Sequence, residues 1–146
     1  SVDVFISIAN NRIARILNSY FFFKGAGEAF MLLVAIKRAK GTLGGLILKI
    51  SGRYRLNERF NSQNYSLDTF TFRRYGKVVS TRLYSVPSAL LGLYERQLVC
   101  SFLGALFGVS LEDSMGRGLR RNEMTCIDEL GVEGYIAIGI DVKIKE

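Results

Sequence analysis

The stretch with the most chemical character runs from Arg121 to Ile138 and reads RNEMTCIDELGVEGYIAI. Glu123 stands three residues before Cys126, and an acidic turn that contains glycine follows. A thiolate is a zinc ligand and a nucleophile, so Cys126 is a metal ligand, a redox thiol or a small core residue. One cysteine beside two turn carboxylates does not supply a tetrahedral zinc site. We therefore expect no metal, and a buried Cys126 in a closing β-hairpin.

The absence of histidine limits the chemistry further, since the chain of 146 residues contains none. Histidine is the usual general base and a common metal and haem ligand. Nucleophile pairs of the Ser–His and Cys–His kinds therefore cannot form within this chain. Tyrosine, lysine, glutamate and cysteine are present, but no spacing identifies two of them as an acid–base pair. We predict a non-enzymatic protein without a cofactor, with an enzyme as the less favoured alternative.

The positive charge is concentrated in the first half of the sequence. The net charge is +7, and residues 1–80 carry 13 lysines and arginines against four acids. A basic half is typical of a solvated surface, but it also suits nucleic acid or an anionic partner. Single-strand binders interleave cations with aromatic residues in the way this half does. The nucleic-acid-binding candidates are Arg53, Arg55, Arg59, Arg73 and Arg74.

The cysteine content and the hydrophobic runs bear on location. Cys100 and Cys126 do not make a disulfide framework, which predicts a reduced, cytoplasmic protein. No apolar run reaches the roughly 18–20 residues of a membrane span. The segment Ala89–Val109 comes closest, but Glu95 and Arg96 interrupt it near its middle.

The spacing of apolar residues indicates one domain over residues 1–146. Helices are predicted over Val2–Phe23, Glu28–Ala39 and Ser88–Gly108, with a break at Lys24–Gly27. Strands are predicted over Leu46–Leu56, Leu67–Arg73, Val78–Tyr84, Arg117–Ile127 and Gly134–Lys145. A turn at Gly76 predicts that Leu67–Arg73 and Val78–Tyr84 form a hairpin. This order predicts an α+β fold, with an antiparallel β-sheet packed against N-terminal helices and one long apolar helix.

The long helix carries a stripe of small residues at four-residue intervals, broken by Arg96: Ser88, Gly92, Cys100, Gly104 and Gly108. Glycine costs up to about 1 kcal/mol in a helix interior relative to alanine. Close packing in the core, a dimer seam or one wall of an apolar pocket would each offset this cost. For the pocket, the predicted ligand-binding residues are Leu91, Tyr94, Leu98, Phe102, Leu106 and Tyr135.

The C-terminal part also resembles a known family. Two short motifs of phenylalanine, leucine and glycine stand at the end of the predicted helix: Phe102–Leu103–Gly104 and Leu106–Phe107–Gly108. A predicted strand with the pattern Glu-x-x-Cys follows, formed by Glu123 and Cys126, and then a turn at Gly131. This order is similar to the C-terminal half of the 4-vinyl reductase domain family, over residues 100–140. The cysteine-to-glycine spacing is one residue longer here, and Tyr135 replaces the second cysteine. The metal-binding cysteine cluster of some members is therefore incomplete.

The resemblance implies a small-molecule-binding or sensor module that shares its α+β fold with subunits of the TRAPP vesicle-tethering complexes. An apolar pocket between helices and sheet would take a hydrophobic small molecule. The resemblance also implies a homodimer paired through the apolar segment Val2–Phe23. Two alternatives stay open: a scaffold or assembly subunit without a ligand, and a nucleic-acid-binding protein with a basic surface.

Overall fold

The computed structural model describes residues 16, 24–39, 41–51, 54–138 and 140–145. The predicted helix Val2–Phe23 lies outside these residues except for Ile16, which is helical and exposed. In the described part, no helix is long and apolar enough to cross a membrane.

Helix α2 (Lys24–Ala39) begins earlier than the sequence predicts. The expected break at Lys24–Gly27 is wrong, because both of its glycines are helical. A Cβ at Gly25 would lie 3.5 Å from the Cβ of Ala105, so this end of α2 packs closely against helix α3. That packing offsets the low helix propensity of glycine. The helix ends at Ala39, whose carbonyl accepts hydrogen bonds from the N–H groups of Thr42 and Leu43.

Helix α3 (Leu91–Leu106) follows a 3-10 turn at Ser88–Leu90, so a helix is present within the predicted range Ser88–Gly108 but is shorter than predicted. Gly108 ends it with a φ of 84°, a conformation that other residues rarely adopt. The small-residue stripe forms no continuous packing seam. A Cβ at Gly92 would meet nothing within 4 Å, whereas one at Gly104 would meet the Val109 side chain at 3.5 Å.

Helix α4 (Leu111–Gly118) replaces the start of the predicted strand Arg117–Ile127. The Ser110 hydroxyl caps it by accepting a hydrogen bond from the N–H of Asp113 at 3.0 Å. Two acids in its first turn favour the same helix end. A Cβ at Gly116 would lie 2.4 Å from the carbonyl oxygen of Lys77, so α4 rests directly on the chain between two strands.

The larger sheet confirms the α+β class but is not wholly antiparallel. Its strands are β1 (Leu46–Ile50), β3 (Phe70–Tyr75), β4 (Val78–Val79), β5 (Leu83–Pro87) and β6 (Met124–Ile127). β3 pairs in parallel with β6 and antiparallel with β4 and β5. The hairpin predicted at Gly76 is present, with Arg74 opposite Val79.

The smaller sheet contains β2 (Tyr54–Leu56), β7 (Val132–Ile138) and β8 (Ile140–Lys145), in the order β2–β7–β8. The predicted strand Leu46–Leu56 is therefore divided between two sheets. The hairpin expected between Arg117–Ile127 and Gly134–Lys145 is also wrong, since β6 joins β3 while β7 pairs with β2 and β8. Gly131, with a φ of 70°, lets the chain between β6 and β7 turn against Phe60.

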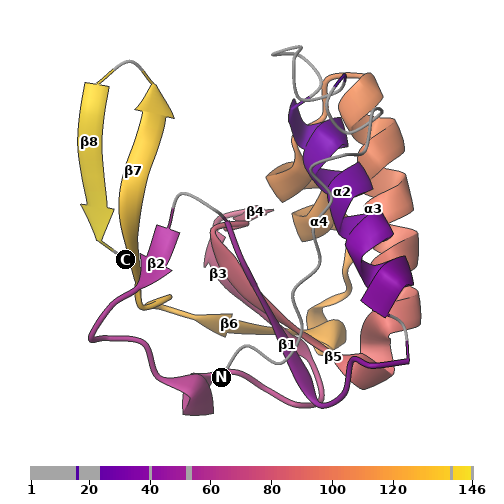
Figure 1. Ribbon diagram of the computed structural model, residues 1–146, viewed down its shortest axis with the longest axis horizontal. Coiled ribbons are helices and arrows are strands. Elements are labelled where there is room, and N and C mark those ends of the chain that lie inside the picture. Colours follow the sequence, from indigo (N-terminus) through magenta and orange to yellow (C-terminus); the bar gives the residue numbers. More distant parts are fainter. Residues whose placement is uncertain (1–15, 17–23, 40, 52–53, 139, 146) are drawn as a thin grey trace.

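Figure 1 shows the helices α2, α3 and α4 on one side of the larger sheet and the smaller sheet at the far end. Phenylalanines of β3 and tyrosines of β5 and α3 fill the main core, together with Leu98, Leu111 and Met115. A second cluster of Tyr65, Leu83, Leu130 and Val132 joins the two sheets. Its position explains why β5 is buried along its whole length.

Candidate functional site

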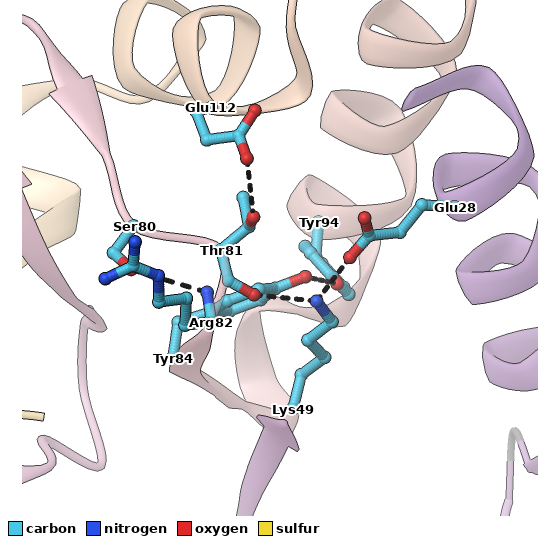
Figure 2. Close-up of polar contacts among 8 residues, drawn as sticks. All are labelled: Glu28, Lys49, Ser80, Thr81, Arg82, Tyr84, Tyr94 and Glu112. Atoms are coloured by element: carbon cyan, nitrogen blue, oxygen red, sulfur yellow. Dashed lines mark hydrogen bonds and ion pairs between the residues drawn. The ribbon is translucent and has the colours of Figure 1, made fainter. Parts of the chain in front are cut away.

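Polar side chains gather in the main core where helix α2, helix α3 and strands β1 and β5 meet (Figure 2). We call them the polar cluster: Glu28, Lys49, Thr81, Tyr84, Tyr94 and Glu112. Lys49 of β1 stands opposite Tyr84 of β5 in the antiparallel register. Directly opposed residues of an antiparallel pair have side chains on the same face. The alternation of LILKI therefore turns one lysine toward the helices.

The centre of the cluster is a pair of tyrosines. The hydroxyl oxygens of Tyr84 and Tyr94 lie 2.5 Å apart, and the two residues are 0% and 3% exposed. Burial raises the pKa of both phenols well above the usual value, so both stay protonated at neutral pH. One hydroxyl donates to the other. For the remaining hydroxyl proton, the described residues provide no acceptor.

Lys49 connects this pair with the surface. Its ammonium group forms an ion pair with Glu28 and donates to the carbonyl oxygen of Thr81 at 2.7 Å. The same nitrogen lies 5.3 Å from the ring centroid of Tyr84, within the range of a cation–π interaction. The Lys49 side chain is 12% exposed and that of Glu28 is 35% exposed. The polar cluster therefore runs from the buried hydroxyls to solvent.

Helix α4 contributes the outer member of the cluster. The Thr81 hydroxyl donates to the carboxylate of Glu112 at 2.9 Å, and the N–H of Arg82 donates to the Ser80 hydroxyl at 3.4 Å. These bonds fix the connection between β4 and β5. Glu112 of α4 therefore helps to position Thr81, whose carbonyl oxygen accepts the hydrogen bond from Lys49.

The surroundings of the tyrosine pair are aromatic. The Tyr84 ring stacks on Phe72 at a centroid distance of 5.0 Å, and the Tyr94 ring lies 6.1 Å from Phe70. Both phenylalanines are fully buried. In this apolar environment a hydrogen bond is electrostatically stronger than in water, and an unpaired polar group costs more.

The predicted ligand-binding residues divide between this core and the surface. Tyr94 and Leu98 are buried in the main core, and Leu91 and Phe102 pack at its margin. Leu106 is 39% exposed. The side chain of Tyr135 lies outside the described part. The sequence interpretation missed Lys49, Tyr84 and Glu28, although a lone lysine in an apolar strand is a readable signal.

The described nucleic-acid-binding candidates lie on strand β2, in the turn that follows it and on strand β3. Arg55 pairs with Glu133 at 2.6 Å and Arg59 with Glu129 at 3.0 Å. On β3, Arg73 lies over the ring of Tyr75, and the Nε of Arg74 donates to the carbonyl of Gly76. Arg53 lies outside the described residues. Arg55 and Arg59 thus each form an ion pair with an acidic residue.

Cys126 is exposed, so the expectation of a buried small residue is wrong. The reason is its strand, because β6 pairs with β3 alone among the described strands and forms an edge of the sheet. Cys100 on α3 is exposed as well. Within the described residues, no group of three potential metal ligands comes together.

The polar cluster brings three kinds of polar group together. It presents a buried phenol proton, an ammonium group and a carboxylate at the edge of an aromatic core, with both phenols protonated at neutral pH. Such a set can orient a molecule that carries an acceptor oxygen. Comparison with known proteins finds no family model, no curated protein and no solved structure that matches this chain.

Proposed function

We propose that the chain is a non-enzymatic binding module for a hydrophobic small molecule held between helices α2 and α3 and the larger sheet. The observation that carries this proposal is the Tyr84–Tyr94 pair, which keeps one proton without an acceptor among the described residues. Leaving a buried donor unsatisfied costs about 1–3 kcal/mol. A ligand with an acceptor oxygen would remove this cost.

The aromatic surroundings support an apolar ligand body. Ligand sites are lined mainly by hydrophobic and aromatic side chains, with a few polar groups that fix orientation. Phe70 and Phe72 supply the first kind of surface and the tyrosine hydroxyls the second. Lys49 and the partly exposed Glu28 mark the side from which the ligand would enter.

The resemblance to the 4-vinyl reductase domain family supports the same proposal, because that family is a small-molecule-binding module. Of the residues predicted from the sequence, Tyr94 supplies one hydroxyl of the pair and Leu98 lies in the same core cluster. Family membership, a homodimer and a cytoplasmic location remain parts of the proposal. Sedimentation at micromolar concentration tests the homodimer separately from ligand binding.

A matched pair of probes tests ligand binding. Acetophenone and ethylbenzene have nearly the same shape, but only acetophenone carries an acceptor oxygen. We expect both to raise the melting temperature, since a ligand that binds only the folded state stabilises it. Acetophenone should bind at least about fivefold more tightly, the equivalent of about 1 kcal/mol, which a single hydrogen bond contributes.

Variants identify the site. The double variant Tyr84→Phe/Tyr94→Phe, which removes both hydroxyl protons, should abolish the difference between the two probes. Leu103→Ala, on the exposed side of α3, should leave it unchanged. Isothermal titration calorimetry measures both affinities. The absence of binding by either probe, and by a wider panel of aromatic and aliphatic ketones, would refute the proposed function.

A further inference from the structure

Helix α3 is apolar on two opposite sides. Its inner side is buried through Tyr94, Leu98, Ser101 and Ala105. Its outer side carries a second apolar surface, which we call the α3 patch: Val99, Leu103, Leu106 and Phe107, together with Val109 just beyond the helix. The spacing of 99, 103, 106 and 107 places these residues on one face of a helix.

The α3 patch is strongly exposed in the described structure. Leu103 is 51% exposed and Phe107 is 88% exposed. Single exposed apolar residues are common, but a contiguous patch marks an interaction surface. Beyond Glu95 and Arg96, the outer side of α3 is apolar over its C-terminal half, and this is the surface that a partner would cover.

The connectivity of the chain indicates which partner this is. Residues 1–23 precede α2 directly, so the Cα of Phe23 is about 3.8 Å from that of Lys24. The start of α2 lies beside the end of α3, because a Cβ at Gly25 would be 3.5 Å from the Cβ of Ala105 and 3.7 Å from the N of Leu111. The N-terminal segment thus joins the fold at the end of α3 that carries Phe107 and Val109.

The segment has the composition and length to cover this surface. Its last four residues, Tyr20–Phe23, are all aromatic, and further apolar residues recur at helical spacing from Val4 onward. As a helix, 23 residues would extend about 34 Å, and the 16 residues of α3 extend about 24 Å. We propose that residues 1–23 dock on the α3 patch of their own chain.

Disulfide trapping tests the proposal, because Cys100 lies exposed on α3 beside the patch. In a Cys126→Ser background, single cysteines are placed at Ala14, Ser19 or Phe22, and the protein is oxidised with copper phenanthroline. Docking within one chain predicts a monomer in which Cys100 is linked to at least one segment position, seen by mass spectrometry and non-reducing electrophoresis. The matched control is Leu67→Cys, on a different exposed surface, which should not link to Cys100.

The other occupants give different results. A disulfide formed only between two chains would show that a second copy covers the patch. A free Cys100 in all three variants would show that the segment does not reach it. Either result overturns the proposal.

A second measurement does not depend on cross-linking. Covering the patch predicts that Phe107→Ser lowers the melting temperature by about 4 °C or more, although Phe107 is exposed in the described structure. Leu67→Ser, a similarly exposed apolar residue elsewhere, should change it by less than about 2 °C. Equal effects of the two substitutions would contradict the docking.

Discussion

The hydroxyl oxygens of Tyr84 and Tyr94 lie 2.5 Å apart in the core, one from strand β5 and the other from helix α3. The two elements are thus joined by a polar contact in a place where apolar packing would suffice. A buried hydroxyl is stabilising only while its partner is present, because a lone buried donor or acceptor keeps the full cost of lost hydration.

Removing one hydroxyl of this pair should therefore cost more than removing both. We expect Tyr94→Phe to lower the free energy of unfolding by about 1–3 kcal/mol, since the Tyr84 hydroxyl loses its only described partner. Tyr84→Phe should behave similarly, and the double variant should recover part of the loss. Urea denaturation of the four proteins gives the coupling energy. Additive losses would show that the hydroxyls contribute independently.

For the Lys49–Glu28 ion pair, the loss of stability should depend on which of the two partners is replaced. Lys49 is the more buried partner, so Glu28→Gln leaves a nearly buried ammonium group without a counter-charge. We expect a loss of about 1–3 kcal/mol, below the range for fully buried pairs because Glu28 is partly exposed. Lys49→Met should cost less, since it leaves a carboxylate that solvent can reach. Urea denaturation measures both, and a costlier Lys49→Met would contradict this order.

Three glycines test the packing of α3 and α4. Gly116→Ala should destabilise by more than about 2 kcal/mol, because the new Cβ would lie 2.4 Å from the carbonyl oxygen of Lys77. Gly118→Ala should cost less, since the atom in its way belongs to the side chain of Gln97. Gly92→Ala, with open space around it, should stabilise by up to about 1 kcal/mol. Thermal denaturation ranks the three, and a tolerated Gly116→Ala would exclude the close contact of α4.

The buried tyrosines predict a loss of stability at high pH. Burial raises the pKa of Tyr65 from 10.0 to about 12. Between these values the unfolded chain releases a proton that the folded protein retains, so this stabilisation is complete below pH 10 and is lost as the pH rises toward 12. We expect Tyr65→Phe to flatten the decline by about 1.4 kcal/mol per pH unit, the equivalent of one proton. Urea denaturation between pH 9 and 12 measures the slope, and parallel curves would contradict the assignment.

Local signals in the sequence predict the elements that depend on local physics. Pro87 and Gly108 bracket the long helix because a fixed φ suits the beginning of a helix and a positive φ suits its end. Gly76 marks its hairpin for a similar reason. Helix α4 was predictable from Ser110 and the acids that follow it, but Gly116 and Gly118 weaken its helical pattern. These glycines reflect contacts with Lys77 and Gln97, which the local sequence does not reveal.

The larger errors concern contacts between distant parts of the chain. Nothing in residues 124–127 indicates that they pair with residues 70–73 rather than with the strand that follows. The candidate site also depends on contacts between distant parts of the chain. Tyr94 was predicted from its helix, but Lys49 and Tyr84 meet it only because the register of β1 and β5 places them together.

The parallel pairing of β3 with β6 affects the order of folding. About fifty residues separate the two strands, and they include both α3 and α4. Such a long connection makes the pairing a slow, late step. During synthesis, β3 would keep an unpaired edge until Met124–Ile127 leaves the ribosome. The interval in which this edge can pair with another chain is therefore at least the time needed to synthesise the residues between the two strands.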